Sequence, residues 1–370
     1  MTPWNWIEQQ FKRRYLRLFE AAFGRLPVSP GAMDLERVRR ILVVRQHDQL
    51  GDFLLSTPAL RALRARFPEA RIGLVARGYT EPVARHNRYV DELFVVPEAL
   101  DRWTPAYTRD FARRLFSGWD VAVVLNTVSH SLTSDLIARF SRARWTVGPS
   151  HRRFPGTQRN FLYNVEVPVA EGTRHQSQRN VDIVRVLGAD TQDLHEELTL
   201  LDREVQAVQQ RLQRQGLARG ARFVLVHPGA GKPRNRWPAE RFGLAARELA
   251  RNFDLQVVVT WGPGEQELGE RVLAQLDGQG VGFAGLTLRE FASLCRLADL
   301  VLCNDTGSMH VAAAVGTSLV AVFGPTDPAE WKPWGEEFVA VRGADHRCSS
   351  VAVGQVVEAA KALLEKGARD

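Results

Sequence analysis

The sequence is poor in cysteine and contains no long apolar run. Its three cysteines, Cys295, Cys303 and Cys348, are too few and too widely spaced for a disulfide framework or a cysteine-based metal site, which favours a reducing compartment such as the cytoplasm. No stretch approaches the roughly 18 uninterrupted apolar residues of a transmembrane helix. The amino terminus lacks a basic segment followed by an apolar core, so we expect no signal peptide.

Several catalytic motifs are absent as well. The sequence has no G-x-G-x-x-G, which argues against a dinucleotide-dependent oxidoreductase, and no G-x-x-x-x-G-K-[ST] of a P-loop. It has no G-x-S-x-G, which argues against a hydrolase with a nucleophile elbow. The nine histidines show neither H-E-x-x-H nor clustered spacing, so we predict no catalytic metal and no bound cofactor.

The composition that remains is that of a globular protein with anionic partners. Hydrophobic residues make up 45% and charged residues 25% of the chain, which is ordinary for such proteins. A length of 370 residues suffices for about two domains. The net charge of +7 predicts a partner such as a nucleotide, a phosphorylated glycan or a membrane surface. We predict no nucleic-acid partner.

An amphipathic helix is predicted at residues 4–23, within an amino-terminal segment of residues 1–38. Apolar side chains recur there at intervals of three or four residues, at Trp4, Ile7, Phe11, Tyr15, Leu18 and Ala22. Lysine and arginine side chains lie toward the other side of this helix. Such a helix can lie on an anionic membrane surface. It can equally pack its apolar side on the protein's own core.

From residue 40 onward, short apolar runs alternate with helical patterns. Strands are expected in two series, at 41–46, 71–77, 92–96 and 120–125, and then at 223–229, 255–262, 300–305 and 318–324. Helices are expected at 56–67, 239–252, 264–276, 287–298, 308–315 and 353–366. This alternation predicts an α/β fold in which parallel sheets are covered by helices on both faces.

Two doubly wound domains follow from the two series, at residues 39–205 and 206–370, with the last helix able to pack back on the first domain. The polar, charged stretch around 190–221 is interpreted as the linker. Ligands of such domains bind outside the carboxyl ends of the strands. The residues that follow each strand are therefore the candidates for function.

In the first domain, an acidic loop follows the first strand. Gly51 permits a tight turn or a positive φ. Asp52 then lies near the start of a helix, where an acid often only interacts with the helix dipole. The functional alternative is a general base, since a carboxylate in a partly dry site can take a proton from an attacking hydroxyl.

In the second domain, a glycine-rich basic loop follows the strand at 223–229. Gly229, Ala230 and Gly231 allow backbone N–H groups to approach a phosphate, and Lys232, Arg234 and Arg236 add positive charge. The alternative is an exposed basic turn. The next loop, "TWGPGEQE", carries Glu265, which either caps the following helix or binds a ribose or base.

The third loop of the second domain is "NDTGSMH". Thr306 and the N–H groups of Thr306, Gly307 and Ser308 are placed to hold an anion at a helix N-terminus. Simple N-capping by Asp305 or Thr306 is the alternative. Capping explains neither the glycine nor His310. A Gly-Pro turn in "AVFGPTDPAEW" follows at the same predicted sheet edge.

Together these motifs resemble glycosyltransferase family 9, the bacterial lipopolysaccharide heptosyltransferases and their relatives. The segments that carry the resemblance span roughly residues 40–340 and are "DQLGDFLLSTPALRALRARFPEARI", "HPGAG…RWPAERF", "WGPGEQE" and "NDTGSMHVAAAVGTSLVAVFGPTDP". The resemblance implies a GT-B fold, with two Rossmann-like domains facing a central cleft. It also implies an acceptor bound mainly by the amino-terminal domain, a nucleotide-sugar bound by the carboxyl-terminal one, and metal-independent, inverting transfer, typically from ADP-heptose.

Residue roles implied by the resemblance are as follows. Asp52 matches the catalytic base; Asp305, Thr306 and Gly307 match the donor-phosphate motif; and Glu265, with Glu267 as a rival, matches the acid near the adenosine. Asn235 stands where the family usually has a phosphate-contacting lysine. For the donor phosphate we predict Thr306, Gly307, Ser308, Gly229, Ala230, Lys232 and Arg236; for the donor sugar or nucleoside, Asp305, Glu265 and His310; and for the acceptor, Asp48, Gln49, Arg152 and Arg153.

The function expected from these assignments is transfer of a heptose or related sugar to a lipopolysaccharide-core or other cell-surface glycan. In that mechanism Asp52 deprotonates an acceptor hydroxyl, while the helix N-terminus after Asp305 and the basic loop stabilise the departing diphosphate. The arginine-rich stretch 141–160 either contacts an acidic glycan or is a solvated basic face. A lipid-linked acceptor suits a protein in the cytoplasm or on the inner face of the cytoplasmic membrane. A UDP- or GDP-sugar transferase, a nucleotide-sugar epimerase and a non-catalytic glycan-binding scaffold are the alternatives.

Overall fold

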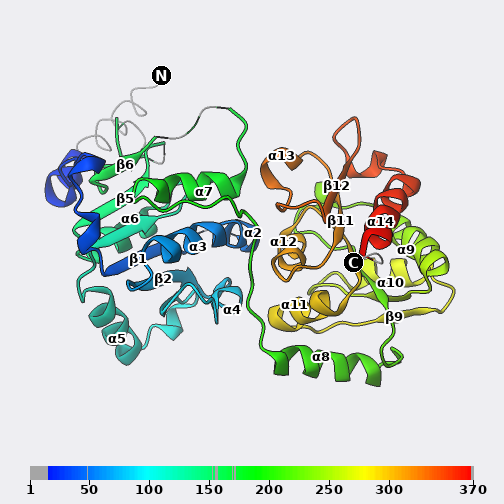
Figure 1. Ribbon diagram of the computed structural model, residues 1–370. Coiled ribbons are helices and arrows are strands. Elements are labelled where there is room, and N and C mark those ends of the chain that lie inside the picture. Colours follow the sequence, from blue (N-terminus) through cyan, green and yellow to red (C-terminus); the bar gives the residue numbers. More distant parts are fainter. Residues whose placement is uncertain are drawn as a thin grey trace, which may run out of the picture. The chain divides into compact units, whose positions relative to one another are not determined.

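The computed structural model describes residues 16–47, 49–151, 153, 154, 157–168, 170 and 172–367. These residues form two compact units (Figure 1). The first unit contains residues 16–47, 58–84 and 88–192, and the second contains residues 49–57, 85–87 and the chain from 193 onward. The segment at 49–57, which carries Asp52, therefore packs with the second unit, although the sequence analysis grouped it with the first domain.

The sheet of the first unit has the strand order β3-β2-β1-β4-β5-β6, and neighbouring strands pair in parallel. Its strands are β1 (Arg40–Arg45), β2 (Arg71–Arg77), β3 (Glu92–Val96), β4 (Val121–Val124), β5 (Trp145–Pro149) and β6 (Val165–Val167). The chain turns outward in opposite directions from β1 and β4, which lie side by side. This reversal makes the ends of β1 and β4 the topological switch point of the sheet.

The sheet of the second unit repeats the same plan, in the order β12-β11-β10-β7-β8-β9. Its parallel strands are β7 (Phe223–His227), β8 (Gln256–Val259), β9 (Gly280–Gly282), β10 (Leu300–Asn304), β11 (Leu319–Phe323) and β12 (Phe338–Arg342). Here the switch point lies between β7 and β10, which pair from Leu300 with Val224 to Cys303 with His227. The two sheets confirm the predicted doubly wound α/β fold.

The helices alternate with these strands. They are α2 (Leu50–Leu54), α3 (Thr57–Arg66), α4 (Glu81–Ala84), α5 (Pro105–Leu115), α6 (Leu132–Phe140), α7 (Gln176–Arg185), α8 (Asp202–Arg214), α9 (Ala239–Phe253), α10 (Gln266–Leu273), α11 (Leu288–Leu297), α12 (Gly307–Ala314), α13 (Pro328–Trp331) and α14 (Val353–Gly367). Single 3-10 turns lie at Pro30–Ala32, Leu35–Arg37, Leu100–Arg102, Pro233–Asn235 and Cys348–Ser350.

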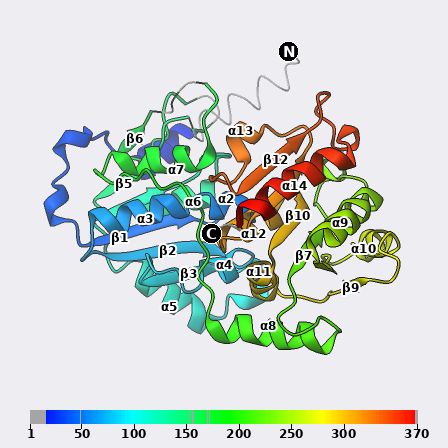
Figure 2. The ribbon, with the colours of Figure 1, turned by 45° about the vertical axis from the view of Figure 1, so that its right-hand side comes forward.

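Buried apolar strands hold each unit together. In the first unit, Leu42 and Val44 of β1 pack against Phe111 of α5 and Ala138 of α6. Side chains alternate across a strand, so Ile41 and Val43 face the other side, where α3 and α7 lie (Figure 1). In the second unit, α9, α10 and α14 cover one face, while α11 and α12 lie on the other (Figure 2). Both arrangements bury the sheets on two sides, as parallel sheets require.

Two differences from the sequence expectations concern helices. The predicted linker at 190–221 contains helix α8, because Val208 and Leu212 give this polar stretch a buried apolar side. The predicted loop after β1 contains the short helix α2. Gly51 lies inside that helix and has no positive φ, so a glycine is not needed there for the turn that we expected.

The described part of the amino-terminal helix packs on the first unit. Residues 16–23 are helical, and Leu16, Phe19 and Phe23 pack against a cluster that contains Phe154 and Phe161. This is the second of the two alternatives given above for the apolar side of the helix. Residues 4–15 of the predicted helix lie outside the described residues. Within the described ranges, no helix combines the length and the apolar character needed to cross a membrane.

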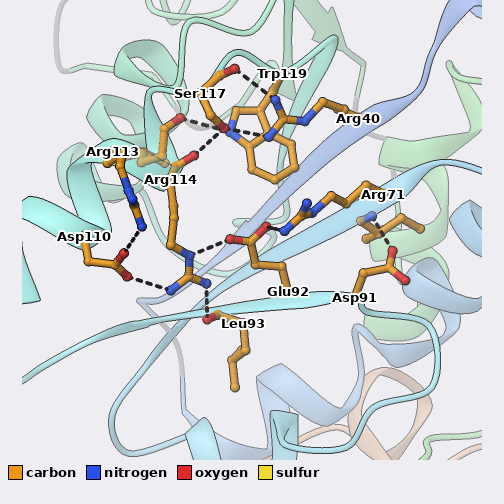
Figure 3. A network of polar contacts seen from close by, with 12 residues as sticks. Arg40, Arg71, Asp91, Glu92, Leu93, Asp110, Arg113, Arg114, Ser117 and Trp119 are labelled. Carbon is orange, nitrogen blue, oxygen red and sulfur yellow. Dashed lines mark hydrogen bonds and ion pairs between the residues drawn. The ribbon is translucent and has the colours of Figure 1, made fainter.

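A network of arginines and acids lies at the amino ends of the strands in the first unit (Figure 3). Glu92, at the start of β3, accepts from Arg71 of β2 at 2.7 Å and from Arg114 of α5 at 2.6 Å. Arg114 also pairs with Asp110 one helical turn away, at 3.3 Å. The network joins strands and helix at the sheet edge opposite to the one where ligands of such folds bind.

Candidate active site

Asn304 organises the switch point of the second sheet. It ends β10 and is fully buried. Its side-chain amide donates to the carbonyl of Pro228 at 2.8 Å, and its side-chain oxygen accepts from the backbone N–H of Trp237, also at 2.8 Å. One side chain thereby fixes both ends of the basic loop that follows β7. Asn304 therefore holds the loop in shape from inside the protein.

Helix α12 begins at this switch point with an uncapped first turn. Its N-cap residue is Thr306, with an extended backbone and no capping hydrogen bond from its side chain. The Ser308 hydroxyl in the first turn is buried and makes no hydrogen bond. The first N–H groups of a helix have no partner within the helix. The N–H donors of this helix start are therefore not capped by the Thr306 side chain, as the capping alternative would require.

Asp305 lies directly before this helix and is almost buried. Burial raises the pKa of Asp305, against the opposing effects of a hydrogen bond with Thr326 and the charges of His310 and Lys232. The side-chain amide of Asn235 donates to its carboxylate and to its backbone carbonyl, each at 3.3 Å. Asn235, which stands where the resemblance implies a lysine, thus holds Asp305 in place.

Gly229 is needed because the Glu265 carboxylate lies against its backbone. A Cβ at Gly229 would come within 1.9 Å of Oε2 of Glu265. Glu265 accepts from the backbone N–H of Gly262 at 3.2 Å and from Arg236 at 3.4 Å. The Arg236 guanidinium also donates to the Ala230 carbonyl at 2.8 Å. The loops after β7 and β8 therefore form one connected surface.

Asp52 is the third residue of α2 and is 9% exposed. One of its oxygens accepts from the backbone N–H of Gln49 at 3.1 Å, which is a capping interaction at the start of the helix. Helix α2 packs against the start of α12, where a Cβ at Gly307 would lie 3.3 Å from Leu50. Within the second unit, α2 thus places Asp52 near the uncapped first turn of α12.

His310, one turn into α12, lies against Gly51 and bonds to Glu196. A Cβ at Gly51 would be 2.5 Å from Cδ2 and 3.0 Å from Nε2 of the imidazole, which explains the glycine. On its other edge, Nδ1 of His310 is 2.8 Å from Oε1 of Glu196. Burial by itself lowers the pKa of His310, but the charges of Glu196, Asp305 and Asp52 raise it overall.

The structure brings the predicted residues of the second unit to one sheet edge. They are Gly229, Ala230, Lys232, Arg236, Glu265, Asp305, Thr306, Gly307, Ser308 and His310, together with Gln49 and Asp52. Lys232 is exposed, whereas Arg236 is already engaged with Ala230 and Glu265. Arg153 is exposed in the first unit and donates to the Gln158 carbonyl at 2.9 Å. Asp48 and Arg152 lie outside the described residues.

Three further residues of the site escaped the sequence analysis: Glu196, Asn304 and Thr326. Glu196 lies in a polar stretch interpreted as a linker, where nothing distinguishes it from its acidic neighbour Glu197. Asn304 was visible as a polar residue closing an apolar strand, which is the signal that identifies it. In the part of the chain that the structure describes, no group of three or more His, Cys, Asp or Glu side chains is placed to hold a metal ion.

Comparison with known proteins gives a consistent family. The model of glycosyltransferase family 9 (heptosyltransferase) matches residues 108–359. Lipopolysaccharide heptosyltransferase 3 of Escherichia coli is 24% identical over 305 residues, which cover 80% of this chain and 87% of that protein.

Two solved structures are similar to the chain in fold. A family 9 glycosyl transferase from Veillonella parvula has a TM-score of 0.78 at 24% identity, covering 91% of this chain and all (100%) of its own. The E. coli heptosyltransferase WaaC, solved with ADP, has a TM-score of 0.70 at 18% identity and covers 88% of this chain and 99% of its own. From the family match, the fold and the motif order, we conclude that the chain belongs to glycosyltransferase family 9 and is a glycosyltransferase.

Proposed function

We propose that the protein transfers a heptose, or a closely related sugar, from ADP-heptose to a lipopolysaccharide-core or similar cell-surface glycan. The observation that carries this proposal is the meeting of an uncapped helix start, a glycine-opened loop and a carboxylate at one edge of the second sheet. Support for the adenine nucleotide comes from WaaC, which was solved with ADP. The heptosyltransferase relatives support the sugar and the acceptor.

The donor diphosphate is proposed to lie at the start of α12. The N–H groups of Gly307 and Ser308 and the Ser308 hydroxyl would bind its oxygens, and the helix dipole favours negative charge there. Lys232 supplies the cation, because it is exposed and its charge lowers the pKa of Asp305, whereas Arg236 is held by the Ala230 carbonyl and Glu265. Glu265 would accept from the ribose hydroxyls.

The transfer step needs a base and a stabilised leaving group. Asp52 takes the proton of the acceptor hydroxyl, whose oxygen forms a bond to the anomeric carbon as the bond from that carbon to the ADP oxygen breaks. The transition state has oxocarbenium character. Preorganised N–H donors and Lys232 then stabilise the charge that develops on the diphosphate, with no metal required. Attack opposite the leaving group inverts the anomeric centre.

Asp305 has a different proposed role from that of the phosphate ligands. A carboxylate repels phosphate, so Asp305 would instead accept from a hydroxyl of the donor sugar. Its bonds to Asn235 and Thr326 hold it in place. Asn235 performs this task where the resemblance implies a lysine, so we assign the contact with the diphosphate to the exposed Lys232.

The acceptor and the location are proposed from the amino-terminal segment. We place the protein in the cytoplasm, on the inner face of the membrane, with a lipid-linked glycan as acceptor. Leu18, within the helix at residues 16–23, and Leu26, after it, support this placement, since they are 65% and 87% exposed while Phe19 and Phe23 of the helix face the protein. Anionic vesicles should bind the wild-type protein more strongly than the Leu26→Gln variant. The exposed Leu132 supplies the control substitution Leu132→Gln.

A nucleotide panel tests the donor assignment. Calorimetry in chelator-treated buffer should give ADP at least about ten times tighter binding than UDP or GDP, a difference of about 1.4 kcal/mol. Lys232→Ala should weaken ADP by about tenfold and adenosine hardly at all, since only ADP carries the diphosphate. Equal affinity for UDP would support the alternative donors. Conversion of the nucleotide-sugar without an acceptor would indicate an epimerase.

A further inference from the structure

Glu196 and His310 form a buried pair inside the second unit. Their side chains are 0% and 5% exposed, and Oε1 of Glu196 lies 2.8 Å from Nδ1 of His310. The other carboxylate oxygen of Glu196 is buried and makes no hydrogen bond. Burying ionisable groups is costly unless they are paired. A pair that leaves one carboxylate oxygen unsatisfied is an expensive way to join two segments, which suggests a purpose beyond packing.

The pair fixes the orientation of the imidazole ring. Glu196 accepts a hydrogen bond from Nδ1 only when that nitrogen carries a proton. The pair therefore determines that Nδ1 is protonated. The opposite edge of the ring, with Cδ2 and Nε2, lies against Gly51 of α2. Any side chain at residue 51 would meet the ring at 2.5 Å. His310 is therefore clamped between Glu196 and the helix turn that carries Asp52.

The charges around the ring favour its protonated form. His310 faces the carboxylates of Glu196, Asp305 and Asp52, and these raise its pKa although burial acts in the other direction. Burial raises the pKa of Glu196 too, against the charges of His310 and His195 and the hydrogen bond to His310. Because three acids surround a single imidazole, we take the ring to hold the proton.

We propose that Glu196 is a positioning residue for sugar transfer: it keeps His310 protonated and oriented, so that the ring places positive charge beside the Asp52 carboxylate. This inference rests on the proposed function, in which Asp52 receives the acceptor proton. A neighbouring cation favours the ionised carboxylate, which is the form that can act as a base. The imidazole keeps its own proton throughout, and the proton of the acceptor goes to Asp52.

Substitution of Glu196 tests the proposal through the pH profile. In Glu196→Gln, the ring loses its main anionic partner and becomes neutral. The acid limb of kcat/KM should then move up by about one pH unit, and kcat at neutral pH should fall by about 10–100-fold. The KM for the nucleotide-sugar should stay within about twofold of wild type, because Glu196 does not touch the donor site. Glu358→Gln, an equivalent change on an exposed part of α14, should alter none of these values.

A purely structural role for Glu196 predicts something else. Glu196→Gln would then lower the melting temperature but leave the acid limb of the folded enzyme in place. That result would overturn the proposal. If wild-type protein transfers no sugar from any nucleotide donor, the proposed function fails by a separate measurement. If transfer occurs and depends on Asp52 while the acid limb of Glu196→Gln does not move, only this inference fails.

A measurement on the wild-type protein guards against a variant that does not fold. Nitrogen-15 NMR of histidine-labelled protein reports the protonation of each ring nitrogen, and the signals of His310 are identified by their loss in His310→Gln. We expect both ring nitrogens of His310 to be protonated at pH 7. A neutral ring, or a ring without a proton on Nδ1, would overturn the proposal without any measurement of activity.

Discussion

Each unit of the molecule buries a glutamate beside a basic partner, and the two glutamates lie in very different surroundings. Glu92 of the first unit is paired with Arg71 and Arg114, whose side chains are 58% and 35% exposed. Glu196 of the second unit is paired with His310, and both are closed off from water. Arginine side chains that reach solvent keep much of their hydration, so the first arrangement costs little.

The difference separates a stabilising network from a site. The network of Figure 3 lies at the amino ends of the strands and ties β2 and β3 to α5. The pair of Glu196 lies beside α12, among glycines that allow close approach and a helix start that lacks a cap. Abundant charged contacts therefore mark structure in the first unit. In the second unit, the buried pair of Glu196 and His310 lies at the place where we expect chemistry.

The largest effect is expected from Asp52→Asn. The variant keeps the shape of the side chain but removes the base, so transfer should fall by about 10²–10⁴-fold. Affinity for ADP should stay within about twofold, because the diphosphate contacts lie on other residues. Product formation followed by mass spectrometry, with calorimetry for ADP, checks both expectations. Near wild-type transfer by this variant would remove Asp52 from the mechanism.

The next largest effect is expected from Gly229→Ala. The added methyl would lie within 1.9 Å of the Glu265 carboxylate and push it from its place. Affinity for ADP should drop by about 10–100-fold, or roughly 1.4–2.8 kcal/mol. Gly354→Ala is the matched control, since a Cβ there meets nothing within 4 Å. Unchanged ADP binding by Gly229→Ala would show that Glu265 does not contact the nucleotide.

Glu92→Gln should affect stability and leave activity alone. Loss of two charged hydrogen bonds at a nearly buried acid should lower the free energy of unfolding by about 1–2 kcal/mol. The loss should shrink at high salt, because the arginine partners are open to solvent. Denaturant unfolding at two salt concentrations measures it. A fall in transfer rate beyond about twofold would contradict the structural role of the network.

A smaller effect on stability is expected at the Glu204–Arg289 pair, which joins α8 to α11, when the pH is lowered. The hydrogen bond from Arg289 lowers the pKa of Glu204 from 4.5 to about 2. A lowered carboxyl pKa stabilises the fold above the unfolded value, and the gain is lost as pH falls from 4.5 toward 2. Glu204→Gln should therefore cost about 1 kcal/mol at neutral pH, because the pair is partly screened by solvent.

The control for this prediction is the pH dependence itself. The melting temperatures of wild type and Glu204→Gln should converge as pH falls from 4.5 toward 2. A gap that stays constant across this range would mean that the pair contributes through packing and not through charge.

Sequence alone predicts the second unit better than its reaction site. Apolar runs located β7, β8, β10 and β11, because strands buried on both faces are continuous hydrophobic stretches. The glycine and threonine of "NDTG" pointed to the helix start. Glu196 could not be found in this way, because it meets His310 only through a contact 114 positions apart in sequence. The need for a glycine at residue 51 could not be found from the sequence either, since it depends on contact with the imidazole of His310 in α12.

The roles of the three cations in the basic loop were also ambiguous in the sequence. Lys232, Arg234 and Arg236 offered equivalent charge there. The structure separates Arg236 from the other two, because Arg236 bonds to the Ala230 carbonyl and Glu265 while Lys232 and Arg234 are exposed. The interpretation of Asn235 changes too. In the sequence it stands where the resemblance implies a lysine, and in the structure its side chain donates to the Asp305 carboxylate.

The most direct test of the central claim is a transfer reaction in chelator-treated buffer. Wild-type protein is given ADP-, UDP- and GDP-linked sugars with a heptose-accepting glycan, and products are identified by mass and by the anomeric NMR signal. We predict one added heptose, from ADP-heptose only, with the anomeric configuration inverted. Transfer from another nucleotide, retention of configuration, or no product without added metal would contradict this account.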